Sequence, residues 1–182
     1  MQNSTIRALI ARQTGMRQVA VGAALACAGS AALAISAWIR VPMFPVPMTM
    51  QTAVVLMLGA TLGARVGAAA AAAYLLEGAL GLPVFAGASL IGTTGGYLAG
   101  FLLAAFAVGL ASERGWMRRP VGLFATLLAG EALIYLPGMT WLHVGFGLDL
   151  HSMLAGGLLP FLPGELVKFA LVGGLLTAVR QR

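Results

Sequence analysis

Apolar runs separated by short polar, Pro-rich or Gly-rich breaks cover most of the chain. Runs long enough to cross a bilayer begin near residues 18, 93 and 121, and shorter runs lie between and after them. About 20 apolar residues in an α-helix cross the hydrocarbon core of a bilayer. The pattern therefore predicts an all-α integral membrane protein, a single membrane domain over residues 1–182 with helices at about residues 18–39, 51–63, 66–80, 93–111, 121–137 and 164–179.

Composition and charge strengthen this prediction. The 182 residues are 60% hydrophobic and only 9% charged, with a mean hydropathy of +0.94, far from the balance of a soluble domain. The net charge is +6, but the basic residues are confined to a few short segments. We interpret that clustering as a signal of membrane topology, so no nucleic-acid partner is expected.

Residues 51–80 allow two interpretations, because 30 mostly apolar residues are interrupted only by glycines and Arg65. One long span gives five helices, whereas two short spans joined at Arg65 give six. Basic residues collect on the cytoplasmic side of membranes, and only the six-helix version puts nine of the 11 on one side. We therefore predict six transmembrane helices with both termini cytoplasmic; the nine residues are Arg7, Arg12, Arg17, Arg65, Arg114, Arg118, Arg119, Arg180 and Arg182.

Two connections on the other side of the membrane are expected to be irregular. Residues 40–50 contain three prolines between Pro42 and Pro47, so they cannot be helical and should run extended as a stiff lid over the bundle. Residues 137–159, which start at Pro137, are expected to form a long outer connection.

The segment P-F-L-P-G-E-L-V-K from Pro160 to Lys168 places two charges in an apolar run. Glu165 and Lys168 are three residues apart, so they share one face of a helix. A charge inside a bilayer costs roughly 2.5–3.5 kcal/mol on insertion scales, which favours a ligand-binding role. A structural ion pair remains the alternative.

Other candidate residues carry weaker signals. Glu131 is a lone carboxyl in mid-membrane that either lines a cavity or packs in a satisfied environment. Tyr97 and Tyr135 either mark the membrane interface or contact a ligand. The two histidines have no metal-ligand spacing, and the sequence has neither a P-loop nor a nucleophile–base arrangement. We therefore expect no metal, no catalytic residue and no ATP hydrolysis by this chain.

Small residues recur every fourth position on the first helix. One stripe holds Ala20, Ala24 and Ala28, and a neighbouring stripe holds Gly22, Ala26 and Ser30. Such stripes let helices approach closely. Packing within the chain and docking of a partner subunit both remain open at this point.

Four motifs in order give the chain a resemblance to the BioY family, the biotin-binding membrane subunits (S components) of energy-coupling factor (ECF) transporters. The motifs are P-V-P-M-T-M-Q-T at residues 45–52, G-L-P-V-F-A-G at 81–87, T-G-G-Y-L-A-G-F at 94–101 and P-F-L-P-G-E-L-V-K at 160–168. The resemblance implies a six-helix S-component bundle in the bacterial cytoplasmic membrane that captures biotin from outside, beneath the Pro-rich connector. It also implies a transmembrane coupling subunit and ABC-type ATPases as partners, which use the ATP, and no cofactor in this chain.

The resemblance also suggests residue roles. The acidic residue and the lysine that contact biotin in the family map onto Glu165 and Lys168, with Glu where Asp is usual. The expected ligand-binding set is completed by Phe85, Tyr97 and Tyr135 as walls and by Gln51 and Gly95 from the same motifs. The stripe of Ala20, Ala24 and Ala28 is the expected docking face for the coupling subunit. Residues 88–93 are shorter than usual, with Thr93 where Pro is common.

Biotin has a ureido group with two N–H donors and a carbonyl, an apolar ring system and a carboxylate. A site for it needs an acceptor, a cationic donor and apolar walls, which Glu165, Lys168 and the aromatic residues offer. The sequence leaves open which end of biotin meets which residue. The alternatives are an S component for another vitamin, a small intramembrane enzyme with Glu131 or Glu165 as base, and a structural subunit without a ligand.

Overall fold

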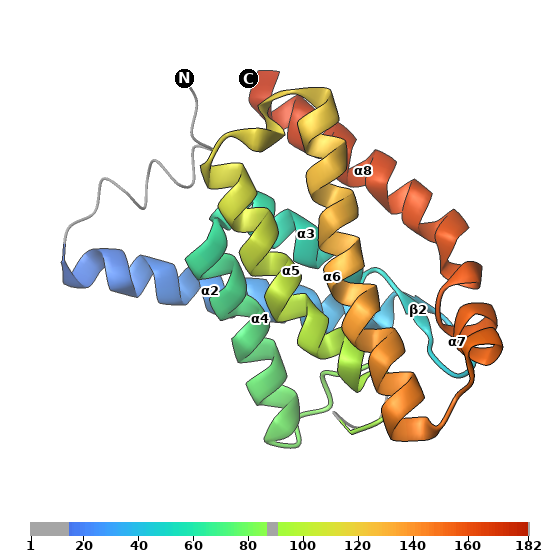
Figure 1. Ribbon diagram of the computed structural model, residues 1–182. Coiled ribbons are helices and arrows are strands. Elements are labelled where there is room, and N and C mark those ends of the chain that lie inside the picture. Colours follow the sequence, from blue (N-terminus) through green and yellow to red (C-terminus); the bar gives the residue numbers. More distant parts are fainter. Residues whose placement is uncertain (1–14, 87–90, 182) are drawn as a thin grey trace.

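The computed structural model describes residues 15–86 and 91–181. Most of these residues are helical (Figure 1). A short antiparallel hairpin, β1 (Arg40–Val41) with β2 (Met48–Thr49), pairs Arg40 with Thr49. The helices are α2 (Met16–Trp38), α3 (Gln51–Leu62), α4 (Ala64–Ala79), α5 (Gly95–Glu113), α6 (Pro120–Phe146), α7 (Leu150–Gly157) and α8 (Leu162–Gln181), with short 3-10 helices η1 (Trp116–Arg118) and η2 (Leu159–Phe161).

Four stretches of the described chain are long and apolar enough to cross a membrane. They are α2, α5, α6 and the combined stretch Leu150–Ala178, which includes α7 and most of α8. The protein is therefore a membrane protein. The ambiguous residues 51–80 form two shorter helices, α3 and α4, that break at Gly63. The φ of Gly63 is 89°, a left-handed conformation that glycine adopts without steric cost.

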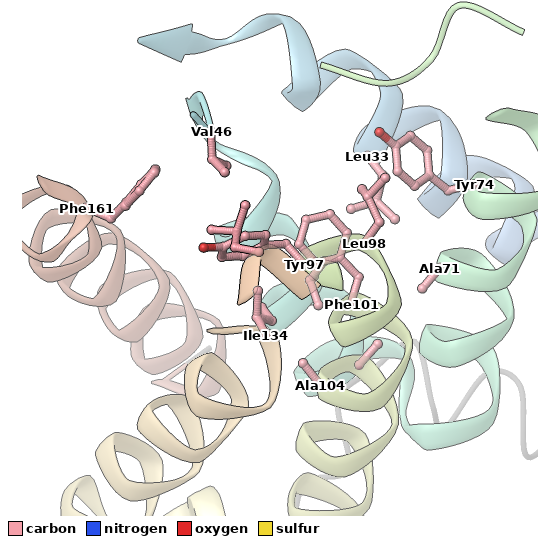
Figure 2. Close-up of a cluster of buried hydrophobic side chains, with 13 residues drawn as sticks. Leu33, Val46, Ala71, Tyr74, Tyr97, Leu98, Phe101, Ala104, Ile134 and Phe161 are labelled. Carbon is pink, nitrogen blue, oxygen red and sulfur yellow. The ribbon is translucent and has the colours of Figure 1, made fainter. Parts of the chain in front are cut away.

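Helix α5 lies at the centre of the bundle and packs against α3, α4 and α6, whereas α2 runs across α4 (Figure 1). Glycines allow the close approach of α5 to α6. A Cβ on Gly100 would lie 2.6 Å from the Cα of Ile134, so only glycine permits this contact. The largest buried cluster combines side chains from α2, the β1–β2 connection, α4, α5 and α6 (Figure 2).

The prediction that the fifth helix ends at residue 137 is wrong, because α6 continues through Pro137 to Phe146. Proline removes one backbone donor from a helix. In a bilayer, however, ending the helix would leave several more backbone groups without partners. The backbone around Pro137 also packs against Gly96 of α5, where an added Cβ would collide with the Pro137 carbonyl oxygen. Packing of α5 therefore supports the uninterrupted helix.

The expected outer connection 137–159 is correspondingly mostly helical. After α6 ends, Asp149 caps α7 by accepting a hydrogen bond from the Ser152 backbone N–H at 3.2 Å. Hydrogen bonds from the side chain and backbone of Ser152 hold the pKa of the Asp149 carboxyl below its usual value. Such a cap fixes where a helix begins, and here it turns the chain back toward α8.

The two small-residue stripes of α2 face different surroundings. Ala26 and Ser30 are buried, and Ser30 donates a hydrogen bond to Glu77 of α4 at 2.6 Å. Ala20, Ala24 and Ala28 are exposed. The inner stripe therefore packs within the chain, and the outer stripe remains available. Of the basic residues used for topology, Arg7, Arg12 and Arg182 lie outside the described residues.

Candidate ligand-binding site

A small cavity lies where the β1–β2 hairpin covers the N-terminal ends of α3, α5 and α8 and the middle of α6. Its volume is about 40 Å³, room for roughly three water molecules. Val46, Tyr97, Ile134 and Phe161 come from four separate segments to form its apolar part (Figure 2). The complete lining is Val46, Pro47, Thr49, Gln51, Thr52, Ala86, Thr94, Tyr97, Leu98, Phe101, Ile134, Tyr135, Phe161, Glu165 and Lys168.

An ion pair with its hydrogen-bond partners forms the polar side of this cavity. Lys168 Nζ lies 2.8 Å from Glu165 Oε1 and also donates to Thr52 Oγ1 at 3.0 Å. The Thr52 hydroxyl lies 3.1 Å from Glu165 Oε2, and the Tyr135 hydroxyl donates to Glu165 Oε1 at 3.0 Å. Glu165 and Lys168 are 6% and 5% exposed. Three neighbours thus surround the carboxylate, which compensates for its burial.

Local sequence explains this placement. Pro163 and Gly164 stand in the first turn of α8, so Glu165 and Lys168 follow at consecutive turns on one face. Thr52 stands in the first turn of α3, and Tyr135 lies in the middle of α6. Three helices that are distant in sequence therefore each contribute to one polar cluster.

Gln51 forms a second polar contact at the cavity. Its Nε2 donates to the Tyr74 hydroxyl at 2.6 Å, and that hydroxyl donates to the Val84 carbonyl at 3.1 Å. Tyr74 is completely buried. It therefore ties the Gln51 amide to the loop that follows α4. Phe85 packs edge-on against the Tyr74 ring, with 5.2 Å between the ring centroids.

Three aromatic rings form part of the cavity wall. Tyr97 packs edge-on against Tyr135, with 5.6 Å between the ring centroids, and the centroids of Tyr135 and Phe161 are 6.0 Å apart. The Tyr97 hydroxyl donates to the Gly157 carbonyl at 2.9 Å. Edge-to-face pairs of this kind are favourable beyond their buried area. The rings present an apolar surface while their hydroxyl groups stay satisfied.

Two contacts tie the rim of the cavity together. An Arg40 guanidinium N–H donates to the carbonyl of Ala86, a lining residue. The Thr93 hydroxyl donates to the Pro45 carbonyl at 2.6 Å. Within the part of the chain that the structure describes, Arg40 forms no ion pair, and its guanidinium lies 5.7 Å from the centre of the Trp38 ring. The hairpin therefore carries an exposed cation beside the mouth of the cavity.

Five of the seven residues expected to bind a ligand line this one cavity: Gln51, Tyr97, Tyr135, Glu165 and Lys168. Gly95 and Phe85 are outside the lining. Gly95 follows the lining residue Thr94 at the start of α5, and Phe85 packs on Tyr74 instead. Sequence reasoning missed Thr52, Val46 and Phe161, although Thr52 was recognisable as a hydroxyl within an apolar helix.

Glu131 lies on α6 one turn before Tyr135 and is 5% exposed. Neither of its carboxyl oxygens has a hydrogen-bond donor within reach among the described residues. It is not part of the cavity lining. The same described residues contain no group of three or more His, Cys, Asp and Glu side chains that could hold a metal ion.

Comparisons with known proteins give one consistent result. A sequence model described as the BioY family matches residues 6–182. A biotin transporter BioY of Thermotoga maritima is 39% identical over 158 residues, which cover 84% of this chain and 90% of that protein. A probable biotin transporter BioY of Pyrococcus horikoshii is 39% identical over 141 residues, covering 75% and 82% of the two chains.

A solved structure has the same fold. The crystal structure of the S component for biotin from an ECF-type ABC transporter matches with a TM-score of 0.78 and covers 93% of this chain and 96% of its own. The two sequences are 24% identical, so this match shows a shared fold only.

Proposed function

Because this chain belongs to the BioY family, we propose that it captures biotin and serves in its uptake as the S component of an ECF transporter. Its relatives at 39% identity are named biotin transporters, and the alignments span most of both chains. The observation that carries the proposal is the buried network of Glu165, Lys168, Thr52 and Tyr135 on the wall of a cavity.

The chemistry of this network suits the ureido group of biotin. The Glu165 carboxylate can accept from ureido N–H groups, and the Lys168 ammonium can donate to the ureido carbonyl. The rings of Tyr97, Tyr135 and Phe161 offer apolar area for the fused ring system. Burial makes each of these polar contacts stronger than it would be in water. A ligand without matching polar groups would displace hydrogen-bond partners of Glu165 and Lys168 and would not replace them.

Charge favours one orientation of the ligand. The wall of the cavity already holds Glu165, and the charge of Glu165 acts on the buried Glu131, with Lys168 as the cation beside them. A ligand carboxylate placed there would add a further buried negative charge, which is strongly unfavourable. Arg40 stands at the rim and forms no ion pair with the described part of the chain. We therefore assign the ureido group to Glu165 and Lys168 and the carboxylate to the mouth beside Arg40.

Binding requires that the cavity widen. A volume of about 40 Å³ holds a few water molecules, far less than biotin. The hairpin is the cover, because Val46, Pro47 and Thr49 all line the cavity. Two side-chain hydrogen bonds tie it to neighbouring loops, from Arg40 to Ala86 and from Thr93 to Pro45, and Val46 packs into the main buried cluster. Outward movement of residues 40–49 would admit the ligand, in the manner of a lid.

We also propose that residues 1–182 form one membrane domain with six spans, both termini in the cytoplasm, in the bacterial cytoplasmic membrane. The backbone N–H of Ala64 donates to Glu113 at 2.8 Å, which brings Arg65 to the same end of the bundle as the Arg114–Arg119 connection. The end of α8 lies at that end as well (Figure 1). Clustered arginines at one end support a cytoplasmic position for it.

For transport we propose a transmembrane coupling subunit and ABC-type ATPases as partners. The exposed stripe of Ala20, Ala24 and Ala28 on α2 suits close packing against a helix of the coupling subunit. The ATPases would use the ATP, so this chain would need no cofactor and would catalyse no reaction itself.

Binding of radiolabelled biotin to the purified protein tests the proposal. Glu165→Ala and Lys168→Ala should each abolish measurable binding. Val167→Ala is a matched control, because Val167 lies between them and is 68% exposed. Unchanged affinity in both site variants would refute the site. Another vitamin identified by mass spectrometry as the co-purified ligand would refute the substrate while keeping the transporter class.

A further inference from the structure

Glu131 is the buried ionisable group that the proposed binding chemistry leaves unexplained. It stands on α6 where that helix approaches α3 closely. A Cβ on the adjacent Gly130 would lie 2.5 Å from Leu56 Cδ2. With 5% exposure and no donor within reach among the described residues, an ionised Glu131 would be an uncompensated buried anion, which is one of the most costly arrangements in a protein.

The charged groups that face Glu131 come from α8. They are Glu165 and Lys168, whose charges both act on Glu131. Glu131 lies one turn before Tyr135 on α6, and the Tyr135 hydroxyl donates to Glu165 Oε1 at 3.0 Å. Beside the adjacent Gly130, the neighbouring side chains from α3 and α5 are the apolar Leu56 and Val108. Helix α6 itself adds the neutral Tyr135. Lys168 is already engaged with Glu165 and Thr52. The cluster thus sets two carboxyl groups against one ammonium.

Two carboxylates are acceptors only, so they cannot form a hydrogen bond with each other. One proton changes this: a protonated Glu131 becomes a donor to Glu165, and the cluster becomes neutral. Adjacent buried carboxyl groups share a proton for the same reason in other proteins. We propose that Glu131 holds a proton that it donates in a hydrogen bond to Glu165, and that biotin binding is linked to this proton. This inference rests on the proposed function.

The sign of the linkage follows from burial. Ligand in the cavity removes water from beside Glu165 and Lys168, which line it, and adds its own negative carboxylate. Both effects make an ionised Glu131 less favourable in the complex than in the free protein. By thermodynamic linkage, the ligand and the proton then favour each other's binding. Biotin affinity should be constant while Glu131 is protonated and should fall as the pH rises far enough to remove the proton.

Measuring the Kd of biotin at equilibrium from about pH 6 to about pH 9.5 tests this linkage. For one linked proton, the Kd rises by at most about tenfold per pH unit. The wild type should lose affinity toward the alkaline end. Glu131→Gln should remove this slope, because the amide donates to Glu165 at every pH. Glu113→Gln, at the other end of the bundle, is the control and should keep the wild-type slope. Equal slopes in Glu131→Gln and the wild type would overturn the proposal.

Calorimetry on the wild type provides a second readout that requires no variant. At alkaline pH, binding of biotin in buffers of different ionisation enthalpy should reveal proton uptake by the protein. An absence of proton uptake would overturn the proposal, because no proton would then be linked to binding. An affinity that depends on sodium ions at fixed pH would also overturn it, because a bound cation would then take the place of the proton. Absence of biotin binding at every pH would instead refute the proposed function itself.

Discussion

Replacing Lys168 by Met separates the binding role of the ion pair from its structural role. The change removes contacts of 2.8 Å to Glu165 and 3.0 Å to Thr52. It leaves Glu165, which is 6% exposed, with only two hydroxyl donors. Breaking a buried ion pair from one side costs about 3–5 kcal/mol. For a chain of this length, that corresponds to a decrease of about 10 °C in Tm. Biotin binding should also be lost.

The double variant Glu165→Leu/Lys168→Met removes both charges, so neither charge is left buried without its partner. Apolar replacement of a buried pair is commonly neutral or stabilising, so Tm should return close to that of the wild type while biotin binding stays absent. Thermal unfolding in detergent, followed by circular dichroism, gives Tm, and radiolabelled biotin gives binding. Val167→Met, on the lipid-facing side of α8, should change neither. Biotin binding by the double variant would refute the reasoning.

Three further predictions concern the rest of the site and the docking face. Thr52→Val removes a hydroxyl that contacts both charged groups and should weaken biotin binding about tenfold in a titration; an unchanged Kd would contradict its role. Arg40→Gln should weaken biotin about tenfold and leave the uncharged biotin amide unaffected, and equal losses for both ligands would contradict the assigned orientation. Ala24→Phe should prevent co-purification with the coupling subunit while biotin binding persists, because a large side chain blocks close helix packing; intact complexes would exclude the Ala20–Ala28 stripe as the docking face.

The family could be predicted from the sequence, and the comparisons confirm it. The membrane class followed from apolar runs, and the break between α3 and α4 followed from Gly63 and Arg65. The length of α6 did not follow, because Pro137 ends helices in most local contexts. Whether a helix continues through proline depends on its neighbours, here on the glycine face of α5, and a single segment carries no information about that.

The candidate site was predictable where local spacing determined it. Glu165 and Lys168 share a helix face by their separation of three residues, and the structure puts them on one cavity wall. Contacts between different helices were not predictable. The position of Thr52 beside both charges, the packing of Phe85 on Tyr74 and the approach of Glu131 to Glu165 depend on how α3, α4, α6 and α8 pack.

A structure of the protein with biotin bound tests the central claim most directly. We expect the ureido group within hydrogen-bond distance of Glu165 and Lys168, with the hairpin at residues 40–49 displaced outward and the carboxylate beside Arg40. Biotin bound at another place, with the Glu165–Lys168 pair unchanged and out of contact with the ligand, would contradict the account.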